Sequence, residues 1–418
     1  MEKDSKNRKL ATDPASNYLR RIDPYWADMW AVPGAEAGIT WHDPKVVRDQ
    51  SARGLFKAKA AELRWSEDKA FAILESSERR QLYLKVIAAT FMWRTLTQEQ
   101  IAAIVGAPGI GAANNHDPHT IFIPWSAGIL QWGHPTDFFK NLRVVRPAYN
   151  IPTRFLNTLS YRERLSVFGG STTVMHGRMA RHNILNAEVS LRVAERLGHL
   201  FPIILGEGSA FAKVLMPQAK NKPPSYSVGD AVWVRADGLR VIIETNSDRA
   251  DPIIEKIKRW AAVLADDARS SRSLYLLFVI TGSRKGDEWM KEMQQKIADN
   301  VFSTLALQGY DARYLASRIG IVEWSEWFPG YHEINNDSFS PPRVWRLNND
   351  RQWQQTSLAD PYMIECNVDP NDALKSIGYA QHLYGVPNFL RNDPIDLSDD
   401  LLALAQRTAR AKMQKVPA

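Results

Sequence analysis

The sequence predicts an α/β protein whose main domain has a mixed β-sheet flanked by helices. Between residues 171 and 330, segments with helical spacing alternate with short apolar segments of the kind that form buried strands. Residues 229–244 hold two such apolar runs joined by a short turn, which is typical of a β-hairpin. Neither run alternates polar with apolar residues, so we expect helices to cover both faces of the sheet.

The first part of the chain is interpreted as an arm followed by a small domain. Residues 1–65 are rich in charge, Pro and Trp, with a short candidate helix over residues 17–29, and residues 66–170 hold the small domain. Its expected elements are helices over 77–91, 97–105 (opening with the capping-box pair Thr97 and Gln100) and 121–132, and strand-like residues over 141–155. This order fits a winged helix-turn-helix that binds DNA, and it also fits a helical domain that only packs.

The second part of the chain is divided into the α/β domain, residues 171–330, and a C-terminal extension, residues 331–418. The expected elements of the α/β domain are a helix over 177–199, a strand over 201–205, the hairpin over 229–244, a helix over 252–265, a strand over 274–280, a helix over 287–307 and a strand over 319–322. The extension ends in a predicted basic helix over residues 401–415, and its role cannot be read from its composition.

Length and composition fit two or three globular domains in a reducing compartment. The 418 residues are 44% hydrophobic, which is enough for sizeable cores. Lys and Arg outnumber Asp and Glu by 53 to 46, and the resulting charge of +7 favours polyanionic partners only modestly. The single cysteine, Cys366, excludes an internal disulfide framework. Because no apolar run is long enough to span a membrane, we expect a cytoplasmic protein without membrane contact.

The turn of the hairpin decides whether its two carboxylates meet. Gly238 can take the left-handed conformation that closes a three-residue loop. Arg235 then pairs with Leu239, and counting outward places Asp230 across from Glu244 on one face, close enough to share one hard cation. A two-residue loop would shift the register by one residue and place the two carboxylates on opposite faces.

Several short motifs agree in order with one family. They are His182-Asn183 at the start of a long helix, Gly229-Asp230 at the head of a strand, Ile242-Ile243-Glu244-Thr245 on its partner, and Lys256-Ile257-Lys258-Arg259-Trp260 on the next helix. Over residues 80–290 the chain thereby resembles the replication-relaxation family, which overlaps the MobC-type relaxases. The resemblance implies a PD-(D/E)XK restriction-endonuclease-like mixed sheet flanked by helices, with an N-terminal winged helix-turn-helix.

The same resemblance implies a metal-dependent DNA endonuclease, of the nickase or relaxase kind, that processes plasmid or mobile-element DNA. Cleavage of a phosphodiester requires positive charge at the phosphate, and Asp230 and Glu244 are the hard oxygen ligands that Mg²⁺ or Mn²⁺ prefers. The expected partners are DNA, bound largely through Lys and Arg contacts to phosphates, and other DNA-processing or transfer proteins. The alternative is a catalytically inactive DNA-binding or regulatory protein of a mobile element on the same fold.

The sequence departs from the nuclease pattern where a lysine is expected. Two residues after Glu244 stands Asn246, which can hydrogen-bond a water but cannot supply positive charge. This substitution favours the inactive alternative. Lys256, on the next predicted helix, is the residue expected to replace the missing lysine, with Lys258 as the second choice. Lys256 can also be interpreted as a helix-surface cation paired with a neighbouring carboxylate.

Two further carboxylates are candidates for the same site. Glu188 projects from the predicted long helix and can add a third carboxylate or position the attacking water; it can also be a solvated helix charge. Glu207 follows the first predicted strand, within a Gly-Glu-Gly sequence that is also typical of an ordinary loop. His116 and His119 have no third ligand nearby in the sequence, so no metal is assigned to them.

Overall fold

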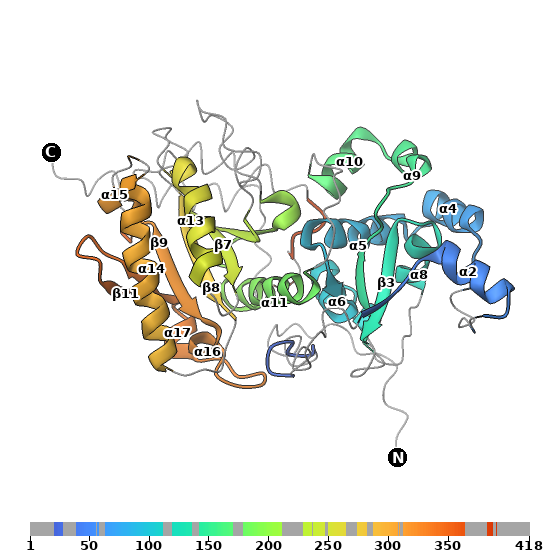
Figure 1. Ribbon diagram of the computed structural model, residues 1–418. Helices are drawn as coiled ribbons and strands as arrows, with labels where there is room; N and C mark the ends of the chain where they lie inside the picture. Colours follow the sequence, from blue (N-terminus) through green and yellow to red (C-terminus); the bar gives the residue numbers. More distant parts are fainter. Residues whose placement is uncertain are drawn as a thin grey trace, which may run out of the picture. The chain divides into compact units, whose positions relative to one another are not determined.

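The computed structural model describes residues 21–27, 39–55, 57, 63–111, 119–135, 142–169, 179–210, 229–235, 237–246, 250–264, 274–281, 287–307, 309, 312–363, 383–387 and 390. Its helices and two β-sheets confirm the predicted mixed α/β class (Figure 1). The chain divides into a first unit, residues 1–196 and 382–394, and a second unit, residues 197–381 and 395–418. Across the described residues, no helix has the length and apolar character needed to cross a membrane.

The first unit contains an antiparallel sheet of four strands in the order β1-β3-β4-β2. The strands are β1 (Ile39–His42), β2 (Leu96–Thr97), β3 (Leu130–Pro135) and β4 (Val144–Pro147). Strand β1 comes from the predicted arm and pairs with β3 along its whole length. The arm therefore supplies an edge strand to this sheet and is more than an appended segment.

Helices make up most of the rest of the first unit. They are α2 (Pro44–Ala52), α4 (Glu67–Ser76), α5 (Arg80–Trp93), α6 (Gln98–Val105), α7 (Pro108–Gly111), α8 (His119–Ser126), α9 (Thr153–Thr158), α10 (Tyr161–Phe168) and α11 (Ala180–Leu197), whose last residue belongs to the second unit. Helices α5 and α6 confirm two predicted helices, and Thr97 and Gln100 form the predicted capping box. The described residues 21–27 of the candidate helix over 17–29 form no helix.

The predicted third helix, over residues 121–132, is wrong in its second half. Helix α8 ends at Ser126 and strand β3 begins at Leu130. Gly128 lies between them with a φ of +73°, a left-handed conformation that ends the helix and turns the chain into the strand. In the same way, the strand-like residues predicted over 141–155 form only the short strand β4 before helix α9 begins.

A segment from the C-terminal part of the chain packs in the first unit. The indole of Trp93 donates a hydrogen bond of 3.0 Å to the carbonyl of Gly385. A Cβ atom at Gly385 would lie 2.9 Å from the carbonyl oxygen of Ala88, so only glycine permits this close approach to α5. The predicted C-terminal extension is therefore shared between the two units.

The second unit contains a mixed sheet of seven strands in the order β11-β10-β9-β8-β7-β6-β5. The strands are β5 (Ile203–Gly206), β6 (Ala231–Val234), β7 (Arg240–Asn246), β8 (Leu274–Ile280), β9 (Ile319–Glu323), β10 (Arg343–Leu347) and β11 (Trp353–Ser357). β7, β8 and β9 run parallel, and the other neighbours are antiparallel. Because β10 and β11 belong to this sheet, the predicted boundary at residue 330 falls inside the unit.

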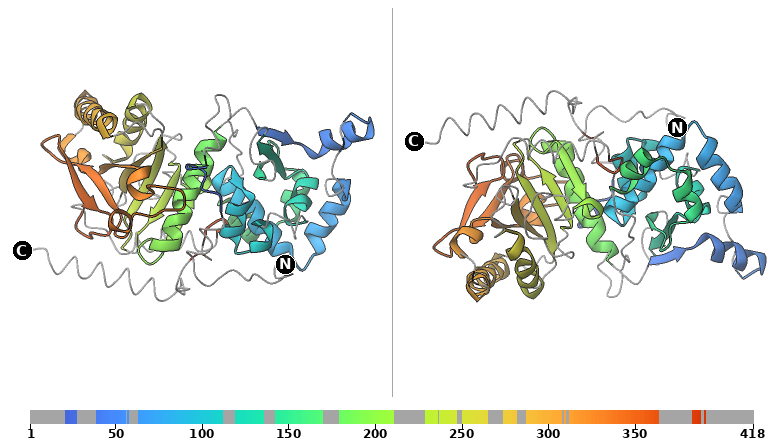
Figure 2. Two further views of the ribbon diagram at one scale, coloured as in Figure 1. Left: turned by 90° about the horizontal axis from the view of Figure 1, so that it is seen from below. Right: turned by 90° about the horizontal axis from the view of Figure 1, so that it is seen from above.

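Helices cover the sheet of the second unit. They are α13 (Ala250–Leu264), α14 (Asp287–Leu307), α15 (Ala312–Ala316), α16 (Trp324–Trp327) and α17 (Asn336–Phe339), with a 3₁₀ turn over Glu207–Ser209. Helices α13 and α14 pack side by side along one face of the sheet (Figures 1 and 2). Every residue of β6, β7 and β8 is buried, which confirms that both faces of these strands are covered. The predicted helix over 401–415 lies outside the described residues.

Candidate functional site

The hairpin of β6 and β7 has the register that the three-residue loop predicts. Gly238 has a φ of +91°. Its amide donates to the carbonyl of Arg235, and the amide of Arg235 donates to the carbonyl of Leu239. Farther from the turn, Ala231 pairs with Ile243. The predicted loop and register are thus confirmed.

Asp230 and Glu244 lie one step beyond the Ala231–Ile243 pair. The Oδ2 atom of Asp230 accepts a hydrogen bond of 2.7 Å from the amide of Thr245, which ties the Asp230 carboxylate to β7 beside Glu244. The side chain of Asp230 is 15% exposed and that of Glu244 only 2%. The hairpin therefore presents one carboxylate near solvent and one in the core.

Lys256 of α13 joins these two carboxylates. Its Nζ lies 2.6 Å from Oε2 of Glu244 and 3.4 Å from Oδ2 of Asp230, and it donates to the carbonyl oxygen of Thr245 at 3.2 Å. We call Asp230, Glu244 and Lys256 the hairpin cluster. The structure thus brings together three of the four residues that the sequence assigned to a catalytic site.

Trp260 is a member of this site to which the sequence gave no role. Its indole Nε1 donates a hydrogen bond of 2.7 Å to Oε1 of Glu244, and its side chain is buried. Lys256 and Trp260 are four residues apart on α13, so they lie on the same face of the helix. That spacing is the signal in the sequence from which the shared role can be read.

The charges of the hairpin cluster perturb one another. Burial raises the pKa of Glu244, and the negative charge of Asp230 adds to the rise, while Lys256 and the Trp260 indole offset part of it. Burial alone would lower the pKa of Lys256, but the two carboxylates outweigh it and raise that pKa above its ordinary value. Lys256 is therefore protonated at neutral pH, between two acidic groups.

Glu188 is buried in a different setting, within the first unit. Its carboxylate is paired with Arg21, at 3.1 Å, and with Arg192, at 3.2 Å, and it accepts a hydrogen bond from Gln100. Burial alone would raise the pKa of Glu188, but the two guanidinium groups lower it to about 2. These contacts give no support to the prediction that Glu188 adds a third carboxylate to the hairpin.

The partners of Glu188 form a larger set that we call the arginine network, which consists of Arg21, Asp23, Glu188, Arg192 and Glu195. Arg21 also makes two hydrogen bonds to Glu195, and Arg192 pairs with Asp23 at 2.9 Å. No side chain of the network is more than 3% exposed. Through these ion pairs and hydrogen bonds, residues 21–23 of the predicted arm bind to helix α11.

The remaining candidate residues occupy three different positions in the second unit. Lys258 pairs with Glu255 at 2.6 Å at the surface, where both side chains are well exposed. Asn246 lies on the same sheet face as Glu244, two residues along the strand, and its carbonyl accepts two hydrogen bonds from Thr281. Glu207 opens a 3₁₀ turn directly after β5.

Metal-ligating groups of three or more His, Cys, Asp or Glu side chains are not found among the residues that the structure describes. A metal at the hairpin would therefore rest on the carboxylates of Asp230 and Glu244. His116 and the side chain of His119 lie outside the described part of the chain.

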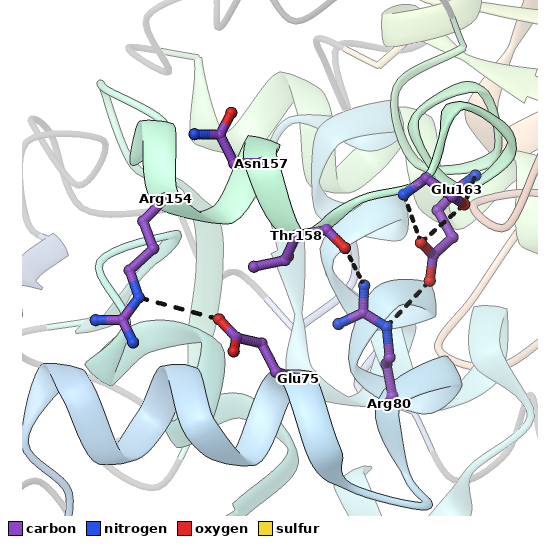
Figure 3. A pocket seen from close by; sticks show the side chains of 7 residues that line it. Glu75, Arg80, Arg154, Asn157, Thr158 and Glu163 are labelled. Carbon is purple, nitrogen blue, oxygen red and sulfur yellow. Dashed lines mark hydrogen bonds and ion pairs between the residues drawn. The ribbon is translucent and has the colours of Figure 1, made fainter.

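A polar surface pocket of about 860 Å³ lies elsewhere, in the first unit between helices α4, α5, α9 and α10 (Figure 3). Its charged side chains are paired, Arg80 with Glu163 at 3.0 Å and Arg154 with Glu75 at 4.0 Å. The pocket contains none of the residues that the sequence assigned to a site. Because its charged side chains pair with one another, we interpret the pocket as a solvated surface groove.

Comparison of the chain with models of known protein families, with curated proteins and with solved structures found no match. The resemblance to the replication-relaxation family stays a prediction.

Proposed function

We propose that this protein is a metal-dependent DNA endonuclease, of the nicking or relaxase kind, that acts on plasmid or mobile-element DNA. The observation that carries the proposal is the position of the Lys256 ammonium, 2.6 Å from Glu244 and 3.4 Å from Asp230. Two carboxylates and one lysine, placed on a hairpin and the following helix, are the residue types that hydrolysis of a phosphodiester requires.

The topology of the second unit supports the same proposal. Strands β5, β6 and β7 form an antiparallel meander, helix α13 follows, and β8 then pairs parallel to β7. A three-strand meander, a helix and a parallel fourth strand, with acidic residues on the second and third strands, is the arrangement expected of a PD-(D/E)XK nuclease. We therefore propose this fold for the second unit.

The hairpin cluster suits a hard divalent cation. Asp230 and Glu244 provide carboxylate oxygens, and together they exceed the positive charge of Lys256 by one. They would hold Mg²⁺ or Mn²⁺, which supplies positive charge at the phosphate and lowers the pKa of water. The protonated Lys256 would donate hydrogen bonds and stabilise negative charge on the phosphate oxygens, in place of the lysine that Asn246 does not provide.

The first unit supports a DNA-binding role less directly. Helix α5, strand β2, helices α6 and α8, and strands β3 and β4 follow one another in the order of a winged helix-turn-helix, and β4 pairs with both β2 and β3. We propose that fold for the unit. Residues Thr120 to Ser126 of α8 are all buried, however, so we assign no base contacts to them.

One observation favours the second candidate, a catalytically inactive DNA-binding or regulatory protein of a mobile element. The ammonium of Lys256 lies where a cation would bridge the two carboxylates, so ion pairs already balance much of their charge. If Lys256 never leaves this position, the cluster is a stabilising ion pair within an inherited fold.

The experiment that separates the two candidates is nicking of supercoiled plasmid DNA in Mg²⁺ or Mn²⁺. We expect the wild-type protein to produce open circles and Asp230→Ala, Glu244→Ala and Lys256→Ala to lose this activity. The matched control is Lys258→Ala, which removes a lysine from the same helix and should nick normally. Open circles produced by all three cluster variants would exclude the assigned site. Salt-sensitive DNA binding without nicking by the wild type would support the inactive candidate.

A further inference from the structure

The two oxygens of the Glu244 carboxylate have different partners, and both partners come from helix α13. Oε1 accepts from the indole of Trp260 at 2.7 Å, and Oε2 pairs with the ammonium of Lys256 at 2.6 Å. Two donors fixed on one rigid helix leave the carboxylate a single orientation. Rotation of this group would break a hydrogen bond or an ion pair, neither of which water can replace at a buried position.

The hydrogen bond from Trp260 differs from those of other tryptophans in the second unit. Trp327, which is also buried, donates its indole N–H to the backbone carbonyl of Arg343 at 2.9 Å. Trp260 donates to an ionised side chain, and such charge-assisted bonds are about twice as strong as neutral ones. Because the indole carries no charge, it stabilises the anion without reducing the net negative charge of the cluster.

We propose that Trp260 is a positioning residue of the hairpin cluster, and that its indole N–H holds the Glu244 carboxylate in the orientation that a divalent cation requires. This inference rests on the proposed function, because the cation is the one proposed there. The charged groups that bear on Glu244 are Lys256 and Asp230. Lys256 pairs with Oε2 and Trp260 donates to Oε1, so the orientation of the carboxylate depends on both residues.

The first test compares Trp260→Phe with the matched control Trp327→Phe in a Mn²⁺ titration at neutral pH. Free Mn²⁺ is followed by electron paramagnetic resonance, without DNA. Loss of a residue that orients a metal ligand costs about 10–100-fold in metal affinity. We expect a loss of that size in Trp260→Phe and no loss in Trp327→Phe. Equal affinities in the two variants would overturn the inference.

The second test needs no metal and so separates the failure of this inference from the failure of the proposed function. Trp260→Phe should lower the melting temperature more in the wild type than in Glu244→Ala, because the indole loses its acceptor when Glu244 is removed. Trp327→Phe should lower the melting temperature equally in both backgrounds. A wild type that binds no Mn²⁺ would count against the proposed function alone, whereas equal effects of Trp260→Phe in the two backgrounds would overturn the role of Trp260.

A third measurement serves if Trp260→Phe does not fold. In ¹⁵N-tryptophan-labelled protein, Glu244→Gln should move one indole N–H resonance far more than the others, because a neutral amide replaces the carboxylate that accepts from Trp260. If the substitution leaves every indole resonance in place, Trp260 does not contact Glu244 and the inference fails.

Discussion

The arginine network of the first unit and the hairpin cluster of the second are both largely buried groups of acidic and basic side chains. They differ in how far their side chains are exposed to solvent. In the arginine network, Arg21 and Arg192 surround Glu188, and no side chain is more than 3% exposed. In the hairpin cluster, Lys256 and Asp230 are each 15% exposed. One group is sealed from solvent, and the other is within reach of it.

Glu188 and Glu244, at the centres of the two groups, have pKa values shifted in opposite directions, although burial also raises the pKa of Glu195 within the arginine network. Guanidinium forks offer several donors, and they lower the pKa of Glu188 to about 2 against the effect of burial. A single ammonium shared between two carboxylates does not overcome burial at Glu244, whose pKa is raised. A buried carboxylate that is incompletely neutralised and lies beside a partly exposed one can accept a further cation. A fully paired one stabilises the fold, which is why burial and charge alone do not identify a site.

The largest effect we expect is on stability, from Glu188→Gln. The substitution leaves Arg21 and Arg192 buried without their shared carboxylate, and breaking a buried ion pair costs about 3–5 kcal/mol. Urea unfolding followed by circular dichroism measures this loss. The control Glu255→Gln, at an exposed ion pair, should unfold as the wild type does. A loss as small as that of the control would contradict a structural role for the network.

A loss of activity comes next, from Lys256→Met. Removal of a donor that stabilises developing negative charge costs about 10²–10³-fold in rate. The nicking rate on supercoiled DNA measures it, with Lys258→Met as the control from the same helix. If both variants nick as fast as the wild type, the ammonium of Lys256 takes no part in the chemistry. The hairpin cluster would then have no function that distinguishes it from the arginine network.

The stability that Glu188 contributes should depend on pH in the acid range. The pKa of Glu188 is lowered from 4.5 to about 2, so the stability that it contributes is present above pH 4.5 and is lost as the pH falls through 2. This shift corresponds to roughly 3 kcal/mol. The unfolding free energies of the wild type and Glu188→Gln should therefore converge by about that amount between pH 5 and pH 2. A gap that stays constant over this range would show that Glu188 has an ordinary pKa.

The smallest effect is the pH dependence of nicking. Glu244 must be ionised to hold a cation, and because its pKa is raised, the ionised form is lost at a higher pH than for an ordinary glutamate. The rate should fall about tenfold per pH unit below that pKa. Lys256, whose pKa is raised above 10.5, adds no alkaline decline below that pH. A rate that stays constant down to pH 4.5 would argue against Glu244 as the limiting group.

Local rules were enough to predict the hairpin and several elements. Gly238 fixed the loop and hence the register, and the continuous apolar run and the long helical pattern gave β8 and α14 with their observed bounds. Strands β10 and β11 were missed because both carry polar side chains among the apolar ones and because β11 is the edge strand of the sheet.

The parts of the site that could not be predicted depend on contacts between residues far apart in the sequence. Nothing near Glu188 in the sequence shows that Arg21, 167 residues earlier, occupies its carboxylate. The four-residue spacing places Trp260 on the face of α13 that carries Lys256, but only the structure shows that its indole N–H donates to Glu244. Lys256 could be predicted because Asn246 stands where a lysine is expected and because the family that the chain resembles has a lysine at the position of Lys256.

Equilibrium binding of Mn²⁺ tests the hairpin cluster as a metal site most directly, because it requires no knowledge of the DNA sequence. We expect the wild type and folded Glu188→Gln to bind an ion with similar affinity, and Asp230→Asn to lose it. Circular dichroism confirms that each variant is folded at the temperature used. Equal binding by the wild type and Asp230→Asn, or no binding by the wild type, would contradict the account of the hairpin cluster as a metal-dependent site.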